Sequence, residues 1–225
     1  MKMLVKIKRQ KDRISEPYWQ TFRYEGTRGT TVAALLDVLN YTDDLFDVDG
    51  NPAPRIRWEC SCMQKLCGAC AMIINGTPAL ACNTFLSDLK EDELVLEPLT
   101  KFPVTADMIV DRSIIEENLK KAEVYQGNFC KSHPKEYAQQ YTTAKCLKCG
   151  LCLEVCPNYQ KGEDFYGALF ANNVYLVHSQ SKDRKKVLKQ RYDSNFASGC
   201  SKALSCEKVC PMGISTLSSM LKMNR

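Results

Sequence analysis

The chain contains 225 residues, of which 44% are hydrophobic and 25% charged, and its formal net charge is +5. This length suits one large domain or two small ones, and no apolar run approaches the roughly 20 residues that a membrane-spanning helix needs. Part of the positive charge is concentrated in residues 181–191, which we interpret as a solvated helix face, so we expect no nucleic-acid partner.

The first part of the chain is predicted to be rich in β-strands. The residue pattern predicts strands at residues 3–10, 18–26, 55–59 and 92–99. Residues 30–42 follow a helical pattern, with Thr31 near the start of the helix.

The second part is predicted to be helical. Residues 105–126, 165–180 and 181–192 mostly follow a helical period. Pro103 marks the change from strands to helices. The sequence therefore predicts an α+β protein of two domains, residues 1–104 and 105–225.

The thirteen cysteines are the main chemical signal of the sequence. An odd number in a chain without an export signal makes a disulfide framework a poor explanation and favours metal binding. Cys130 stands alone, and the other cysteines fall into three groups: Cys60, Cys62, Cys67, Cys70 and Cys82; Cys146, Cys149, Cys152 and Cys156; Cys200, Cys206 and Cys210.

The first group contains the ligand spacing of plant-type [2Fe–2S] ferredoxins. Cys62-x4-Cys67-x2-Cys70, followed by Cys82, reproduces that spacing. Gly68 suits a loop whose backbone must approach the cluster closely. Cys60 would place the first ligand two positions too early, so we interpret it as a spare thiol.

The second group, CLKCGLCLEVCP at residues 146–157, is the bacterial ferredoxin run. In such runs three cysteines hold one cluster and the fourth reaches across to another. Zinc is the structural alternative because paired cysteines also form tetrahedral zinc sites. Zinc, however, needs neither the third cysteine at this spacing nor the Cys-Pro ending.

The third group repeats that run with one ligand missing. Aligning Cys210-Pro211 with Cys156-Pro157 places Ala203 at the position of Cys149. The crossover rule then predicts that Cys146, Cys149, Cys152 and Cys210 hold a [4Fe–4S] cluster, while Cys156, Cys200 and Cys206 remain. Three thiolates predict a [3Fe–4S] cluster most simply, and a four-iron cube with an open or non-protein ligand is the alternative.

The three motifs together resemble one known family, the iron–sulfur subunits of succinate dehydrogenases and fumarate reductases. The resemblance covers essentially the whole chain and rests on CMQKLCGACAMIINGTPALAC, CLKCGLCLEVCPNY and CSKALSCEKVCPMGI, in the family's order and spacing. It implies a β-grasp plant-type [2Fe–2S] ferredoxin domain followed by an all-α helical ferredoxin-like domain with two further clusters. It also implies the same three ligand sets, with the [2Fe–2S] cluster near a flavoprotein and the [3Fe–4S] cluster beside a quinone.

The implied partners are an FAD-containing flavoprotein subunit and membrane anchor subunits, with haem as a further expectation. Such a subunit is peripheral, at the cytoplasmic face of the cell membrane. Ubiquinone-type relatives often carry a tryptophan and a histidine where this chain has Lys161 and Ser201. Menaquinone-linked relatives lack these groups too, so the resemblance favours menaquinone as the acceptor.

We assign no catalytic residue to this chain. Reduction of fumarate needs a flavin, cationic groups for two carboxylates and a proton donor. The sequence contains no GxGxxG fingerprint, and its two histidines, His133 and His178, lie far apart. A soluble flavoprotein enoate reductase that uses a donor other than a quinone is the alternative system for such a subunit, and a cluster-based sensor is a third interpretation.

Overall fold

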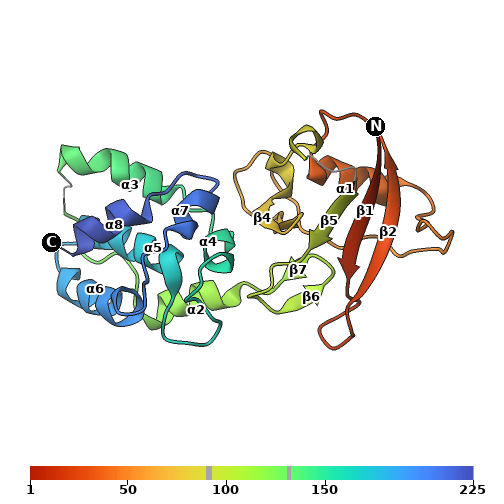
Figure 1. The fold of residues 1–225 in the computed structure, drawn as a ribbon. Helices are drawn as coiled ribbons and strands as arrows, with labels where there is room; N and C mark the ends of the chain where they lie inside the picture. Colours follow the sequence, from red (N-terminus) through yellow and green to blue (C-terminus); the bar gives the residue numbers. More distant parts are fainter. Residues whose placement is uncertain (90–92, 131–132, 225) are drawn as a thin grey trace. The chain divides into compact units, whose positions relative to one another are not determined.

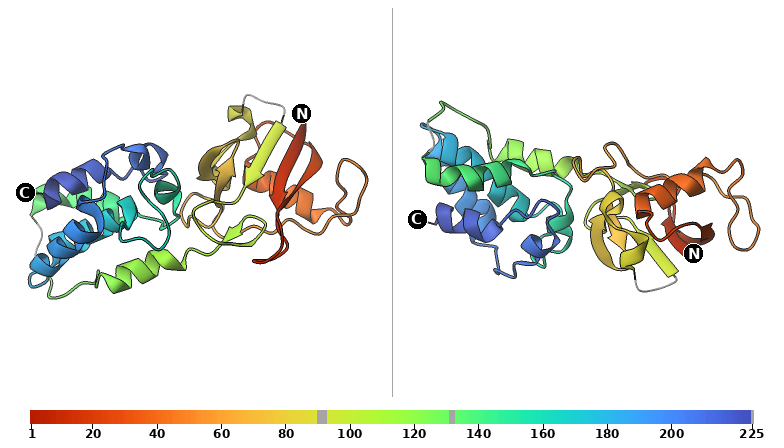
Figure 2. Two further views of the ribbon diagram at one scale, coloured as in Figure 1. Left: turned by 60° about the horizontal axis from the view of Figure 1, so that its bottom comes forward. Right: turned by 90° about the horizontal axis from the view of Figure 1, so that it is seen from above.

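The computed structural model describes residues 1–89, 93–130 and 133–224. The chain forms two compact units, Met1–Asp111 and Arg112–Arg225, each with its own core. Figures 1 and 2 show a unit of strands followed along the chain by a unit of helices. In the described ranges, no helix combines the length and the apolar character that a membrane span requires.

The first unit is a mixed sheet with one helix across a face. Its five strands are arranged in the order β2-β1-β5-β3-β4. The central neighbours β1 and β5 are parallel, whereas the other neighbouring pairs are antiparallel. The strands are β1 (Lys2–Arg9), β2 (Tyr18–Glu25), β3 (Ala71–Ile74), β4 (Thr77–Leu80) and β5 (Glu93–Glu97).

The core of this unit lies between the sheet and helix α1 (Val32–Tyr41) (Figure 1). Strand β1 alternates buried and more exposed residues, and Val5 and Ile7 are fully buried. Thr31 lies at the start of α1 as predicted, and it caps the helix because its side chain accepts a hydrogen bond from the Ala34 N–H at 3.2 Å. This α+β arrangement, with a helix across a mixed sheet, agrees with the predicted β-grasp architecture.

The hairpin of β3 and β4 was not predicted, although the sequence carries a signal for it. Asn75 and Gly76 form the turn at φ values of 45° and 74°, both in the left-handed region. Asn-Gly is the preferred pair for such two-residue hairpin turns. The hairpin matters for the site because it brings the segment after β4 back to the residues before β3.

The predicted strand at residues 55–59 is wrong, because this stretch has no regular structure. Side chains satisfy its backbone instead of a neighbouring strand. The Asn40 amide pairs with both the N–H and the carbonyl of Ile56 at 2.8 Å, and the Arg57 N–H donates to Asp107 Oδ2 at 2.9 Å. The alternating pattern was real, but it reflects burial of Ile56 rather than sheet pairing.

The helical pattern at residues 105–126 is confirmed only for Ser113–Lys121 and is wrong for the residues before it. Its first part is a β-hairpin of β6 (Val104–Ala106) and β7 (Ile109–Val110), and helix α2 covers only Ser113–Lys121. Asp107 turns the hairpin at a φ of 45°. The strands therefore continue beyond Pro103, and the first compact unit extends to Asp111. The predicted domain boundary after residue 104 stays a prediction.

The second unit is built from helices. Helix α5 runs through its centre and packs against α8, α6, α3 and α4. An apolar cluster that includes Phe170, Val174 and Leu188 forms its core. The elements are α2, the 3-10 turn η3 (Pro134–Glu136), α3 (Tyr137–Ala144), α4 (Leu151–Glu154), α5 (Gly167–Gln180), α6 (Lys185–Tyr192), the π-turn η4 (Asp193–Ala197), α7 (Ser205–Val209) and α8 (Thr216–Met223).

The predicted helix at residues 165–180 is confirmed as α5, and the one at residues 181–192 is confirmed from Lys185 onward. Gly167 begins α5 at a φ of 75°, and a Cβ at this position would lie 2.4 Å from Leu153 Cδ2. Only glycine therefore allows α5 to start this close to α4. Because α4 lies inside the second cysteine run, this contact fixes the central helix against the site.

Candidate iron–sulfur sites

Cys62, Cys67 and Cys70 lie in the irregular loop before β3, and Cys82 lies in the 3-10 turn η1 (Ala81–Asn83) directly after β4. The β3–β4 hairpin closes the distance between them, since the Ala81 N–H donates to the Cys70 carbonyl at 3.1 Å. Cys62 also shares a side-chain hydrogen bond with Cys67, and Cys70 shares one with Cys82. The structure thus gathers the four predicted [2Fe–2S] residues.

The loop directs backbone N–H groups at the sulfur of Cys62. Gln64 and Leu66 donate to Cys62 Sγ at 3.4 and 3.2 Å. Met63 and Lys65 make this possible by adopting left-handed φ values of 54° and 61°. Successive N–H groups that converge in this way form a concave anion site. The bond from Gln64 and then that from Leu66 lower the pKa of Cys62 to about 7.

Cys60 has a different environment from Cys62. Burial, followed by the negative charges of Asp37 and Cys67, raises the pKa of the Cys60 thiol. The two candidate thiols therefore shift in opposite directions, and the one that receives N–H donors is Cys62. Burial also raises the pKa of Cys70 to about 12. Binding of Cys70 as a thiolate would therefore require the positive charge of the cluster iron to offset this rise.

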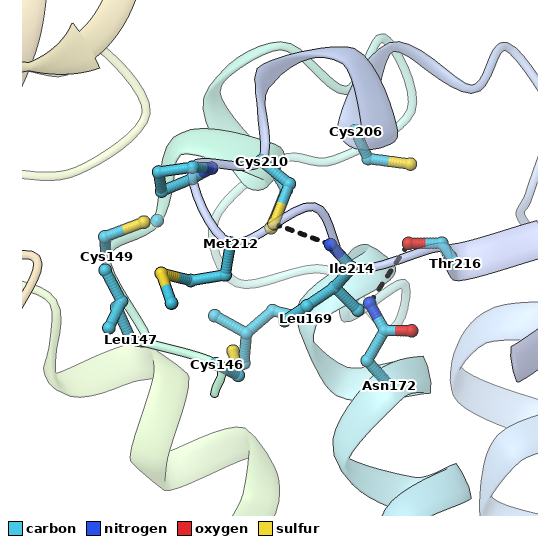
Figure 3. Close-up of a pocket in the computed structure, with 13 residues that line it drawn as sticks. Cys146, Leu147, Cys149, Leu169, Asn172, Cys206, Cys210, Met212, Ile214 and Thr216 are labelled. Atoms are coloured by element: carbon cyan, nitrogen blue, oxygen red, sulfur yellow. Dashed lines mark hydrogen bonds between the residues drawn. The ribbon is translucent and has the colours of Figure 1, made fainter. Parts of the chain in front are cut away.

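The other seven motif cysteines line two pockets in the helical unit. Cys206 and Thr216 line both pockets. The first is lined by Cys146, Leu147, Cys149, Gly150, Cys152, Leu169, Asn172, Cys206, Cys210, Pro211, Met212, Ile214 and Thr216, and Figure 3 labels ten of these residues. The second is lined by Cys156, Pro157, Asn158, Phe165, Ala168, Phe196, Cys200, Ser201, Lys202, Ala203, Leu204, Ser205, Cys206, Thr216 and Met220.

The charges of neighbouring thiols act mainly within the two predicted ligand sets, and Cys206, which lines both pockets, also acts on Cys152. Burial, followed by the charges of Cys149, Cys146 and Cys210, raises the pKa of Cys152 well above its usual range. For Cys206, burial raises the pKa first, and the charges of Cys156 and Cys200 add to it. Cys210, from the third run, therefore lies with the first three cysteines of the second run.

The backbone repeats itself between the two cysteine runs. Lys148 and Gly150 lie at φ values of 51° and 87°, on either side of Cys149, and helix α4 follows. Lys202 and Leu204 lie at 60° and 55°, on either side of Ala203, and helix α7 follows. The third run has therefore kept the loop conformation of the second run although it lacks the corresponding cysteine.

Nitrogen hydrogen-bond donors also point at cysteine sulfur atoms in the helical unit. The Ile214 N–H donates to Cys210 Sγ at 3.4 Å (Figure 3). Asn173 Nδ2 lies 4.0 Å from Cys146 Sγ. Burial raises the pKa of Cys149 to about 11, and the charge of Arg112 opposes that rise. Among the described residues, no three His, Cys, Asp or Glu side chains are placed to hold a single metal ion.

The remaining candidate residues lie elsewhere or have other contacts. Cys130 lines neither described pocket, and its Sγ lies 3.9 Å from the Ser179 carbonyl. Ser201 lines the second pocket, and its hydroxyl donates to Asn158 Oδ1 at 2.7 Å. Lys161 is exposed and does not line that pocket.

The two histidines occur in different settings. His133 Nδ1 accepts the Lys135 N–H at 3.2 Å. Burial, followed by the charge of Lys185, lowers the pKa of His178 on α5. Neither histidine lines either thiol pocket in the described part of the chain.

Sequence reasoning missed the polar residues around the thiols. Thr216 and Asn172 line the first pocket and are hydrogen-bonded to each other at 3.0 Å. Thr216 follows the Cys-Pro ending closely in sequence, whereas Asn172 comes from the distant α5. The only available signal was a polar residue on the otherwise apolar face of a predicted helix.

Two family models match this chain. A 2Fe-2S iron-sulfur cluster binding domain matches residues 4–117, and a 4Fe-4S dicluster domain matches residues 145–215. The strand unit with its four gathered thiols and the helical unit with its two thiol pockets thus define an iron–sulfur protein with a ferredoxin-type first domain.

The named relatives show which family of iron–sulfur proteins this chain is similar to. The chain is 30% identical to the succinate dehydrogenase iron-sulfur subunit of Bacillus subtilis, with 97% of this chain and 90% of the relative covered. It is 31% identical to the fumarate reductase iron-sulfur subunit of Escherichia coli O6:H1, with 79% and 74% covered. The chain belongs to the family of succinate dehydrogenase and fumarate reductase iron–sulfur subunits.

A solved structure has the same fold. The match is to a chain of the Mycobacterium smegmatis Sdh1 complex in the apo form, with a TM-score of 0.75 and 24% identity. The similarity covers 99% of this chain and 94% of that chain. Together with the two family models, this match confirms the predicted order of a strand-rich [2Fe–2S] domain and a helical dicluster domain.

Proposed function

We propose that this chain is the electron-transfer subunit of a succinate:quinone oxidoreductase that works as a succinate dehydrogenase or a fumarate reductase. It passes electrons between the FAD of a flavoprotein partner and a membrane quinone. Iron–sulfur clusters, when bound, supply one-electron oxidation and reduction without bond making in the substrate. The chain itself holds, spaces and shields these clusters.

The proposed ligands form three sets. Cys62, Cys67, Cys70 and Cys82 hold a [2Fe–2S] cluster; Cys146, Cys149, Cys152 and Cys210 hold a [4Fe–4S] cluster; and Cys156, Cys200 and Cys206 hold a [3Fe–4S] cluster. The observation that carries the proposal is that Cys210, from the third run, lines the first pocket with Cys146, Cys149 and Cys152, while Cys156 and Cys200 line the second and Cys206 lines both. This exchange of a cysteine between runs is characteristic of two-cluster ferredoxins.

The chemistry of the pockets fits iron–sulfur clusters. Thiolates are the usual protein ligands of these clusters, and N–H donors to sulfur stabilise their negative charge. Such donors are Gln64 and Leu66 at Cys62 and Ile214 at Cys210. The second pocket is lined by the methyl group of Ala203, at the position where the second cysteine run has the thiol of Cys149. A methyl group offers no lone pair to iron, which supports the three-iron assignment.

The partners follow from family membership. An FAD-containing flavoprotein supplies the dicarboxylate chemistry, and membrane anchor subunits, with haem as a further component, supply the quinone site. We place the complex at the cytoplasmic face of the cell membrane, with this chain as a peripheral subunit. Lys161 and Ser201, in place of the aromatic and imidazole groups of many ubiquinone-linked relatives, support menaquinone as the acceptor.

Turnover measurements on this chain, with and without its flavoprotein partner, test whether this chain only transfers electrons while the flavoprotein carries out the dicarboxylate chemistry. Dithionite should reduce the isolated chain and produce paramagnetic cluster signals, while succinate and fumarate should leave it unchanged. Adding the flavoprotein subunit should allow succinate to reduce the clusters. Oxidation of succinate by the flavin-free chain would contradict the proposal, and so would the absence of cluster signals.

A further inference from the structure

Thr216 and Cys206 occupy a special position between the two thiol pockets, because they are the two described residues that line both. Thr216 is the first residue of α8 and is only 2% exposed. Figure 3 shows its hydroxyl joined to Asn172 by a hydrogen bond, with Cys206 among the other residues that line the pocket. A group at this place can act on one cluster without being a ligand of either.

The hydrogen bonds of Thr216 give its hydroxyl a defined direction. Asn172 Nδ2 donates to Thr216 Oγ1 at 3.0 Å, and Asn172 is itself only 5% exposed. A hydroxyl has one proton to donate, and an incoming N–H leaves that proton free for another acceptor. Cys206 is the sulfur that shares both pockets with Thr216, and a side-chain hydrogen bond from Thr216 opposes the rise in pKa that burial causes in the Cys206 thiol.

The surrounding contacts hold Thr216 in place. Ser215 caps α8 by accepting the Ser218 N–H at 3.1 Å, and its own hydroxyl donates to Glu207 Oε1 at 3.0 Å. Glu207 also accepts the Leu217 N–H. Because Glu207 directly follows Cys206, one hydrogen-bond network connects the start of α8 to the segment that carries the ligand sulfur.

We propose that Thr216, oriented by the positioning residue Asn172, donates a hydrogen bond to Cys206 Sγ and thereby raises the reduction potential of the cluster in the second pocket. A donor to ligand sulfur stabilises the added negative charge of the reduced cluster more than the charge of the oxidised one. The effect on potential is local because the hydrogen bond goes to the sulfur of one proposed ligand, whereas Cys210 of the other set has its own donor in Ile214. It favours electron transfer from the first pocket to the second. This inference rests on the proposed function, because it requires a cluster in the second pocket.

The test compares Thr216→Val with wild type in the assembled complex by redox titration followed by EPR. Valine keeps the shape of threonine and removes the donor. We expect the midpoint potential of the second-pocket cluster to shift downward while the other two potentials keep their wild-type values. Thr216→Ser, which restores the hydroxyl, should return the potential to that of wild type.

Ser201→Ala is the matched control, because it removes a hydroxyl from the same pocket that donates to Asn158 rather than to sulfur. It should leave the potential unchanged. If Thr216→Val fails to assemble its cluster, Thr216→Ala removes the same donor without adding a methyl group. An unchanged second-pocket potential in both donor-free variants would overturn the inference, as would an equal shift of both pockets. A wild-type complex without any second-pocket cluster would instead overturn the proposed function.

Discussion

At the scale of single residues, the cluster loops depend on backbone conformations that L-amino acids seldom adopt. Met63 and Lys65 accept left-handed φ values, and two N–H groups reach Cys62 Sγ as a result. Each such residue costs roughly 1–2 kcal/mol relative to an ordinary conformation. The loop therefore carries local strain, and binding a negatively charged cluster is the chemistry that this arrangement favours.

The first testable prediction is that Cys62, and not Cys60, is the first ligand of the [2Fe–2S] cluster. Cys62→Ser should perturb or abolish the [2Fe–2S] EPR signal, because serine replaces the thiolate that receives both N–H bonds. Cys60→Ser and Cys130→Ser should leave all three cluster signals intact. A [2Fe–2S] signal lost in Cys60→Ser and retained in Cys62→Ser would reverse the assignment.

The missing ligand gives a second prediction. Ala203 lines the second pocket and lies between two left-handed residues, as Cys149 does in the intact run. Ala203→Cys should therefore place a thiol at the fourth corner and allow a [4Fe–4S] cluster to form. Its added negative charge should lower the reduction potential there. We expect the oxidised three-iron EPR signal to disappear and quinone-linked turnover to fall, while flavin-linked dye reduction is largely kept.

The wild-type complex provides the reference for this experiment. Prepared without oxygen, it should already show the three-iron signal. A four-iron cube at this site in the wild type would mean that the alanine does not explain the cluster type.

At the scale of elements, one buried carboxylate organises the segments on which the first cluster loop depends. Asp107, in the β6–β7 turn, pairs with Arg9 of β1 at 3.1 Å and accepts the N–H groups of Gln10 and Arg57, each at 2.9 Å. Residues 55–57 lead directly into the cysteine loop. The hairpin thus holds the entry to that loop without a regular strand.

Asp107→Ala should destabilise the first unit strongly. The side chains of Arg9 and Asp107 are only 1% and 2% exposed, and removing one partner leaves the other charge buried without its ion pair. Such a loss costs about 3–5 kcal/mol. Glu25→Ala is the matched control, because Glu25 and its partner Lys2 are 68% and 83% exposed and such surface pairs contribute about 0–1 kcal/mol. Denaturant unfolding followed through the [2Fe–2S] absorption measures both, and equal effects would contradict the argument.

The two short helices of the cysteine runs depend on the clusters in another way. Helix α4 has 4 residues and α7 has 5, too few to form stable helices alone. Helix α5 has 14 residues and contributes to the apolar cluster of the second unit. Removing iron should therefore loosen α4 and α7 while α5 persists.

Hydrogen exchange on the whole chain, with and without its iron, checks this expectation. Amides at residues 146–157 and 200–214 should lose protection in the iron-free chain. Those of α5 should keep most of theirs. A uniform loss of protection throughout the second unit would show that its apolar core also needs the clusters.

At the scale of the whole molecule, the donor atoms for each cluster come from within one compact unit. Cys62, Cys67, Cys70 and Cys82 belong to Met1–Asp111, and the other seven proposed ligands belong to Arg112–Arg225. No proposed cluster needs residues from both units. Each unit can therefore be loaded by its own thiols.

The metal content of the purified chain follows from this division. The proposed clusters require about nine iron atoms per chain, with about ten inorganic sulfides. Anaerobic iron and sulfide analysis measures both. Stoichiometric zinc with little iron would contradict the three cluster assignments, and about ten irons would favour a complete cube in the second pocket.

Local features of the sequence were sufficient where the determining interactions are themselves local. The helix at residues 30–42 and the strand pair at residues 3–10 and 18–26 are present because periodic burial and the Thr31 cap are short-range effects. Predictions failed where distant side chains satisfy the backbone. Residues 55–59 are irregular because of Asn40 and Asp107, neither of which a local pattern can place beside them.

The sequence by itself determined the class of this protein, because cysteine spacing along the chain reflects the geometry of a cluster held by one short loop. The crossover rule also predicted from spacing that Cys210 joins Cys146, and the tertiary structure brings the two together by packing α7 beside α4 and α8 beside α5. Only the tertiary structure decided what surrounds the sulfur atoms. The Asn172–Thr216 contact joins helices that are distant in sequence, and no spacing rule encodes the direction of one hydroxyl.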